Sequence, residues 1–408
     1  MAVGSGELAK LWPVKGFQLA TGCAGIKVAG RRDLVIMALA EGAEIATVFT
    51  RNAFCAAPVQ LAKKHLADTC RKSNGIRYLL TNTGNANAGT GEQGLKDALQ
   101  TCASLAAIGA VDVEQVMPFS TGVIGEPLPI EPILAALPTT FTALDENGWA
   151  AAAEGILTTD TRAKGASRQI DINGETVTVT GIAKGAGMIR PDMATMLGYV
   201  ATDARCARHD LQAILNAAVN KSFNRITIDG DTSTNDSLVL VATGQSPAVL
   251  DDGADRARLV EAVEQVCIEL AQAIVRDGEG ATKFVTVAVA GGASVAECLQ
   301  VAYTVADSPL VKTALFASDP NWGRILAAIG RAGVDSLNVD DVKVWLDDVL
   351  IAERGGRAAS YTEQAGQQVM NQEELSIRID LARGDVSETV WTTDLSYDYI
   401  RINAEYRT

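Results

Sequence analysis

Residues 185–200 read GAGMIRPDMATMLGYV and lie close to the middle of the 408-residue chain. A glycine-rich turn opens this stretch, and an apolar run typical of a buried strand closes it. Thr195 lies between the two, directly after Ala194, where a strand alone gives its hydroxyl no evident use. This position therefore needs either a structural or a chemical explanation.

The composition is that of a globular protein with a packed core. Hydrophobic residues make up 48% of the chain and charged residues 21%, which is ordinary for this class. The net charge of −14 argues against nucleic acid, because binding phosphates requires a basic face. Because no apolar run has the length of a membrane span or a signal peptide, we expect a cytoplasmic protein without a membrane partner.

Cysteine and histidine usage argues against a metal centre. The seven cysteines are widely spaced and form no CxxC pair, which indicates free buried thiols in a reducing compartment. The only histidines, His65 and His209, lie in polar contexts and are predicted to be solvated. A histidine-dependent triad or metal site would have to be built from these two isolated residues.

Three glycine-rich stretches invite a nucleotide-binding interpretation. They are GNANAGTGEQG at 84–94, KGAGM at 184–188 and DGEGATK at 277–283. None matches a phosphate-binding loop or a dinucleotide fingerprint, so no cofactor is expected. An ordinary nucleotide-binding α/β protein stays open as an alternative.

Strand-like and helical patterns alternate along the chain, and no Pro/Ser-rich linker divides it. Long helices beside apolar strands indicate layered sheets with helices outside. Strands are predicted at 25–30, 33–42 and 283–292, with a strand, loop and strand over 225–244. Strands that run into glycine-rich turns are predicted within 77–91, 115–125 and 175–188, and short strands at 342–351, 375–381 and 387–394. Helices are predicted at 94–109, 133–158 with a break at Pro138, 210–223 and 254–278.

Thr195 would acquire a base if the chain were cut in front of it. A threonine hydroxyl is a weak nucleophile until a base removes its proton. After cleavage of the bond to Ala194, the freed α-amine would have an ordinary pKa of about 7.7–8.0, which suits a general base. In the intact chain the same nitrogen is an amide. The residues thus suggest self-cleavage, against the alternative of an ordinary Ala–Thr pair in a strand.

Segments along nearly the whole chain resemble one enzyme family. Residues 183–197, AKGAGMIRPDMATML, are similar to the self-cleavage segment of the ornithine acetyltransferases (glutamate N-acetyltransferases) of arginine biosynthesis. That family belongs to the N-terminal-nucleophile-like group. Further segments match in the family's order, namely TGCAGIKVAGRRDL, TNTGNANAGTG, FSTGVIGEPLP, ILTTDT, IDGDTSTNDS, RDGEGATKF, SPLVKTALFASDPNWGRI and INAEYRT.

The resemblance implies roles for the matching residues. Thr195 would be the nucleophile for both self-cleavage and acetyl transfer, and Thr121 with Gly122 would form the oxyanion hole. Without the resemblance these positions read as turns, helix caps or surface charges, and Arg324 in DPNWGRI is given no catalytic role. The substrate contacts implied are Thr158, Lys184, Thr195, Glu279, Asn403 and Thr408.

The fold that the resemblance implies is a layered α/β architecture of the N-terminal-nucleophile-like type, with helices outside stacked sheets. The precursor would be cut after Ala194 into an α chain, 1–194, and a β chain, 195–408. The two chains would stay together as one structural unit and pair further, as two of each.

The implied reaction moves the acetyl group from N2-acetyl-L-ornithine to L-glutamate through an acetyl-threonine, without metal or cofactor. Use of acetyl-CoA as a second donor stays open. Two further alternatives are a self-processing amidase or aminopeptidase of the same superfamily, and a structural or interaction protein that is never cut.

Overall fold

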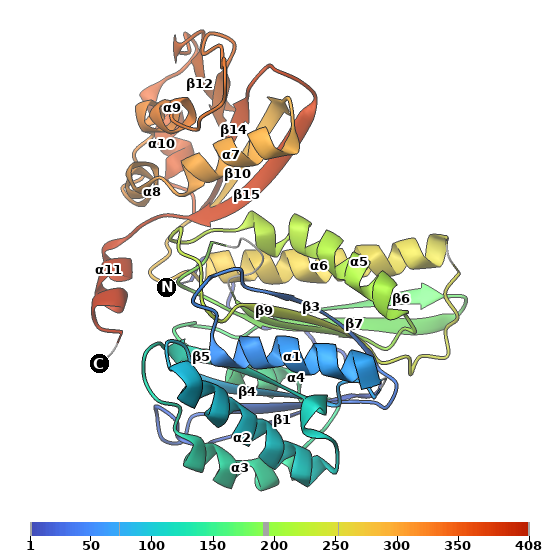
Figure 1. Ribbon diagram of the computed structural model, residues 1–408. Coiled ribbons are helices and arrows are strands. Elements are labelled where there is room, and N and C mark those ends of the chain that lie inside the picture. The colour runs from blue at the N-terminus through green and yellow to red at the C-terminus, as the bar shows by residue number, and fades with distance from the viewer. Residues whose placement is uncertain (1, 73, 191–195, 252, 407–408) are drawn as a thin grey trace.

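The strands in the described part of this chain form three sheets, and two of the sheets stack face to face. The computed structural model describes residues 2–72, 74–190, 196–251 and 253–406. Helices cover the outer face of each stacked sheet, which gives four layers, and the third sheet forms a separate lobe near the C-terminus (Figure 1). The predicted class, layered α/β sheets with helices outside, is confirmed.

The first sheet is four-stranded, with the order β1-β2-β4-β5, and only β4 and β5 run parallel. Successive side chains along its strands point alternately into two apolar cores. In β2, Val35 and Met37 pack toward the second sheet, whereas Leu34 and Ile36 pack against outer helices. The elements of this half are β1 (Phe17–Gly22), β2 (Leu34–Leu39), α1 (Ala57–Lys72), β4 (Tyr78–Asn85), α2 (Gly91–Gly109), η1 (Val113–Gln115), β5 (Val116–Val123), α3 (Ile130–Thr142) and α4 (Trp149–Gly155).

The second sheet is five-stranded, with the order β3-β9-β8-β7-β6. Every residue of its central strands β8 and β9 is buried, because one face meets the first sheet and the other meets α5 and α6. β8 runs antiparallel to β7 and parallel to β9. The elements are β3 (Glu44–Phe49), β6 (Lys164–Ile172), β7 (Glu175–Lys184), β8 (Leu197–Thr202), α5 (Arg208–Lys221), η2 (Phe223–Arg225), β9 (Ser237–Ala242) and α6 (Ala254–Arg276).

The third sheet is six-stranded, has the order β13-β12-β11-β14-β10-β15 and encloses its own apolar core. After it, α11 (Tyr397–Ala404) returns beside the two-sheet sandwich (Figure 1). None of the described helices is both long and apolar enough to cross a membrane. The elements of this lobe are β10 (Phe284–Gly292), α7 (Val295–Ala306), α8 (Pro309–Phe316), α9 (Trp322–Gly330), β11 (Lys343–Leu346), β12 (Val349–Glu353), β13 (Gly356–Arg357), α10 (Glu363–Met370), β14 (Glu374–Asp380) and β15 (Val386–Thr393).

Three sequence predictions about local structure are wrong. Residues 25–30 form a loop, whose start is shaped by Asp33 accepting the N–H groups of Ala24 and Ile26. Residues 226–229 form no regular strand, and only Ile226 makes an isolated bridge. The helix does not break at Pro138, which lies inside α3; the interruption comes at 143–148, where Asp145 pairs with Leu19.

The prediction that His65 is solvated is also wrong. His65 is 2% exposed, and its Nδ1 lies 2.7 Å from the carbonyl oxygen of Val116. Spacing of four residues places it with Leu61 and Thr69 on the inner face of α1. The neighbouring Lys63 and Lys64 make the segment polar in sequence, which is why the histidine was predicted to be solvated. His209 is exposed, as predicted.

Candidate active site

A cavity of about 250 Å³ opens where the two stacked sheets meet at one end of their strands. The carboxyl end of β5, the end of β7 and the beginnings of β8 and β9 converge there. The predicted residues Thr121, Gly122, Thr158, Lys184, Glu279 and Asn403 all line this cavity. The chain thus brings together predicted residues as far apart in sequence as Thr121 and Asn403, which are separated by 282 positions.

Thr121 and Gly122 lie near the end of β5, next to the parallel strand β4. Gly122 has a φ of +136°, a conformation that side chains other than hydrogen rarely adopt. A Cβ at this position would lie 2.2 Å from the carbonyl carbon of Gly84. Glycine is therefore required here, and it leaves the backbone next to Thr121 open to the cavity.

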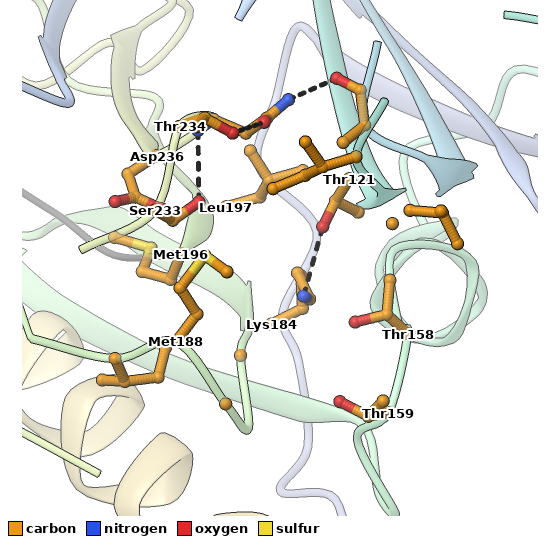
Figure 2. Close-up of a pocket in the computed structure, with 18 of the residues that line it drawn as sticks. Thr121, Thr158, Thr159, Lys184, Met188, Met196, Leu197, Ser233, Thr234 and Asp236 are labelled. Atoms are coloured by element: carbon orange, nitrogen blue, oxygen red, sulfur yellow. Dashed lines mark hydrogen bonds between the residues drawn. The ribbon is translucent and has the colours of Figure 1, made fainter. Parts of the chain in front are cut away.

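Lys184 is the last residue of β7, and its side chain points toward Thr121 (Figure 2). Its Nζ donates a hydrogen bond to Thr121 Oγ1 at 3.3 Å. Burial lowers the pKa of the Lys184 ammonium, whereas the carboxylate of Asp160 opposes that shift. The outcome is a buried lysine amino group held directly beside a hydroxyl group.

A network of buried charges lies behind Lys184. The side chains of Asp160 and Asp277 are fully buried, and Lys164 Nζ lies 2.6 Å from a carboxylate oxygen of each. Lys184 Nζ lies 3.9 Å from Asp160 Oδ2. Burial alone would raise the pKa of Asp160, but Lys164 and Lys184 outweigh it, so the pKa lies below its ordinary value. Asp160 is therefore ionised over the whole physiological pH range.

Thr158 lies beside Lys184 in the cavity wall, together with Thr159 (Figure 2). Its backbone N–H donates to Asp160 Oδ2 at 3.0 Å, and its hydroxyl lies 3.4 Å from the same oxygen. The carbonyl of Thr158 accepts from Arg31 Nη2 at 3.2 Å. These bonds fix a loop that would otherwise be free between α4 and β6.

Glu279 and Asn403 form the side of the cavity that carries an acidic group. Glu279 follows α6, is buried, and accepts a hydrogen bond from Asn403 Nδ2 at 2.7 Å. A Cβ on Gly187 would lie 2.5 Å from Glu279 Oε2, so the absence of a side chain there makes room for the carboxylate. The site thus holds a cation and a carboxylate that are not paired with each other.

Three predicted residues, Ala194, Thr195 and Thr408, lie outside the described residues. Met196, which follows Thr195 in the sequence, lines the cavity. Arg324 lies on α9, where it donates to Leu310 O and Thr313 Oγ1, and it is not part of the cavity wall.

Sequence reasoning missed several residues of the site. Asp160 is not among the predicted residues, although its buried carboxylate beside two lysines is the centre of the network. Asn235 ties the two sheets together by donating to the carbonyls of Ala86 and Ser120 at 2.6 and 2.9 Å. Tyr406 lines this cavity and a neighbouring one of about 290 Å³. The local sequence gives little signal for Asp160, because it is one charge among Glu154, Arg162 and Lys164.

The arrangement can stabilise an oxygen that gains negative charge at Thr121 and Gly122, and it can bind a substrate with both an acidic and a basic end. Among the described residues no group of three or more His, Cys, Asp or Glu side chains is placed to hold a metal ion. The fold and the site together define a two-sheet α/β sandwich with a polar pocket between its sheets.

Comparison with known proteins assigns the family. The model of the ArgJ family matches residues 18–408, and this chain belongs to that family. An arginine biosynthesis bifunctional protein ArgJ from Pseudomonas fluorescens (strain Pf0-1) is 63% identical, and one from Pseudomonas syringae pv. tomato is 61% identical, with 100% of each chain covered. The resemblance predicted from the sequence is confirmed.

Solved structures also match. The crystal structure of the arginine biosynthesis bifunctional protein ArgJ from Bacillus halodurans is 37% identical over 50% of this chain and 97% of that chain, with a TM-score of 0.48.

Proposed function

We propose that this chain is an acetyltransferase of arginine biosynthesis that moves the acetyl group of N2-acetyl-L-ornithine to L-glutamate. The products are ornithine and N-acetylglutamate. The observation that carries the proposal is the convergence of Thr121, Gly122, Lys184 and Glu279 on one cavity in a chain of the ArgJ family. The full-length identity to relatives named for arginine biosynthesis supports this choice of substrates.

Self-cleavage between Ala194 and Thr195 would come first. The Thr195 hydroxyl attacks the Ala194 carbonyl carbon, and the peptide nitrogen leaves as the α-amine of Thr195. Water then hydrolyses the resulting ester, which restores the hydroxyl and leaves Ala194 as a free carboxylate. The sequence position of Thr195, directly before a cavity-lining residue, supports its access to the site.

Acetyl transfer would follow in two half-reactions. The α-amine of Thr195 takes the hydroxyl proton while the oxygen attacks the acetyl carbonyl. The Thr121 hydroxyl and the Gly122 N–H donate to the oxyanion, and ornithine leaves with the proton. Glutamate then attacks the acetyl-threonine with its amine, which releases N-acetylglutamate and regenerates Thr195. No step uses a metal or a cofactor.

Substrate contacts would be shared among the remaining wall residues. Lys184 suits a substrate carboxylate, and Glu279 suits a substrate amine, because charge-assisted hydrogen bonds are the stronger ones. Asn403 would hold Glu279 in place, as its hydrogen bond suggests. Thr158, Thr195 and Thr408 would complete the set of contacts.

A second activity is proposed as well. The relatives are named bifunctional. We propose acetyl-CoA as the other donor, its thiolate leaving in place of ornithine.

Both activities would run in the cytoplasm, in an assembly of two α chains, 1–194, and two β chains, 195–408. A native mass twice that of the cut chain would support the assembly, and the mass of a single copy would contradict it.

Cleavage is tested with a denaturing gel and N-terminal sequencing of each band. We expect two bands, of 194 and 214 residues, with the larger one beginning TMLGYV at Thr195, and a single inactive band for Thr195→Ala. An uncut Thr195→Ala protein with full activity would contradict the scheme.

Transfer is tested by supplying N2-acetyl-L-ornithine with and without glutamate. N-acetylglutamate formed only with glutamate supports a transferase. Free acetate formed equally fast without glutamate would instead support the alternative, a self-processing amidase or aminopeptidase.

A further inference from the structure

We propose that Asp160 is the positioning residue of this site: its carboxylate holds the Lys184 ammonium beside Thr121, so that the Thr121 hydroxyl keeps its hydrogen for the substrate oxygen. This inference rests on the proposed function, because it assumes that an oxyanion forms at Thr121. It adds a residue outside the cavity wall to the machinery of the site.

The Asp160 carboxylate connects four parts of the site at once. Oδ1 accepts from Lys164 Nζ at 2.6 Å and from the backbone N–H of Gly185 at 2.7 Å. Oδ2 accepts from the backbone N–H of Thr158 at 3.0 Å and lies 3.9 Å from Lys184 Nζ. One fully buried side chain therefore fixes the two residues that flank the cavity and the backbone that follows Lys184.

The direction of the hydrogen bond between Lys184 and Thr121 explains why the charge matters. An ammonium group has only donors, so Thr121 Oγ1 must accept from it at 3.3 Å. The single hydroxyl hydrogen of Thr121 is then free to donate into the cavity. A neutral amine has a lone pair and could accept that hydrogen instead, which would remove one of the two donors of the oxyanion hole.

The charges that face Lys184 determine whether it keeps its proton. Burial lowers the pKa of Lys184 and the nearby Lys164 lowers it further, whereas Asp160, Asp236 and Glu279 raise it. Asp160 is the largest of these opposing influences. Without its negative charge, Lys184 would lose its proton at a lower pH.

The same network provides a matched control. Asp277 is also fully buried and also lies 2.6 Å from Lys164 Nζ, and among the described residues no ion pair joins it to Lys184. Asp160→Asn and Asp277→Asn therefore remove equivalent charges from Lys164, but only the first removes the carboxylate that faces Lys184. Both variants are expected to melt at a lower temperature than the wild type.

The test is the pH profile of enzyme acetylation by N2-acetyl-L-ornithine, followed by mass spectrometry of the cut protein in single turnovers. Protonated Lys184 supports the reaction, so activity is present below its pKa and lost above it. We expect Asp160→Asn to move the basic limb of the profile down by about 1–3 pH units, the size that a close opposite charge gives. Asp277→Asn should leave that limb in place.

A shift of equal size in both variants, or no shift in Asp160→Asn, would overturn the proposal. For a variant that stays uncut, self-cleavage is the readout in its place, since the proposal places the oxyanion of self-cleavage at Thr121 as well. Loss of cleavage in Asp160→Asn alone supports the proposal, and equal loss in both variants overturns it. Wild-type protein that N2-acetyl-L-ornithine does not acetylate contradicts the proposed function itself rather than the role of Asp160.

Discussion

Asn403 donates a hydrogen bond to Glu279 at 2.7 Å across 124 positions of sequence. Asn403 belongs to α11, a helix in which no residue is buried, so its position depends largely on polar contacts, beside the edge-to-face contact of Tyr397 with Phe316. Two more polar contacts hold it, from Tyr399 OH to Asp229 at 3.2 Å and from Ser396 Oγ to Gly280 O at 2.7 Å. The last helix of the chain is therefore anchored directly to the carboxylate of the site.

Replacing Glu279 with Gln should weaken substrate binding without loosening α11. The amide oxygen of Gln can still accept from Asn403, so only the negative charge is lost. Because a hydrogen bond to a charged group contributes about 1.5–3 kcal/mol, we expect KM for N2-acetyl-L-ornithine to rise about 10-fold to 100-fold. Steady-state kinetics measure this, and an unchanged KM would show that Glu279 does not contact the substrate.

Gly187→Ala should act through the same carboxylate. The new Cβ would lie 2.5 Å from Glu279 Oε2, the end of a flexible side chain that can move aside. We expect KM to rise while the melting temperature changes little. A double-mutant cycle checks the mechanism: Gly187→Ala should add little to KM in a Glu279→Gln background, and fully additive effects would disprove the coupling.

Gly122→Ala should be far more damaging than Gly125→Ala. Both glycines have positive φ, at +136° and +85°, so both substitutions carry a conformational cost of about 1–2 kcal/mol. Only Gly122 would also place its Cβ against backbone, 2.2 Å from the Gly84 carbonyl carbon, whereas a Cβ at Gly125 would have no atom of the described residues within 4 Å. We expect Gly122→Ala to lower kcat by about 100-fold or more, since it displaces an oxyanion donor.

Chemical denaturation and steady-state kinetics on both variants make this comparison. Equal losses of stability and of kcat would show that the close approach of Gly122 to Gly84 has no special role.

The stability of the fold should depend on the titration of Lys312. Burial lowers the pKa of this residue from 10.5 to about 8, and its Nζ donates to Thr392 Oγ1 at 3.0 Å. The unfolded chain then binds more protons than the folded chain between about pH 8 and pH 10.5. The stability contribution of Lys312 is therefore present above pH 10.5, the pKa in the unfolded chain. It is lost as the pH falls through about 8, the pKa in the folded chain.

Relative to Lys312→Met, the free energy of unfolding of the wild type should rise by up to about 3 kcal/mol between pH 7.5 and pH 10.5. Urea titrations of both proteins at each pH measure the difference. Parallel stability curves for the two proteins would rule out a depressed pKa at this position.

The sequence patterns predicted the central strands of the sandwich because their apolar runs are long and buried. They missed the edge strands β1, β3 and β6. β9, with all its residues buried, is an example. Patterns failed where tertiary contacts decide, as at 25–30, where Asp33 holds a loop, and at His65, which α1 turns inward.

The predicted site residues came from motifs, and the structure gathers those that it describes around one cavity. Asp160 was not predicted, because its role in the site depends on contacts with residues that no local sequence pattern reveals. Lys164 lies four residues away, but the Asp277 that completes the network lies 113 positions from Lys164. Pairings over such separations follow from the sheet order and not from neighbouring residues.

The order β3-β9-β8-β7-β6 interleaves segments from before and after the proposed cleavage point. Strands β8 and β9, from the later segment, are enclosed on both sides by β7 and β3 from the earlier one. Cleavage of the chain after Ala194 would not separate the two fragments, because the hydrogen bonds between these strands still hold them together. Covalent continuity is therefore needed only to reach the fold: fragments made separately would each present bare strand edges and an unshielded apolar face, and neither could be a soluble half-enzyme.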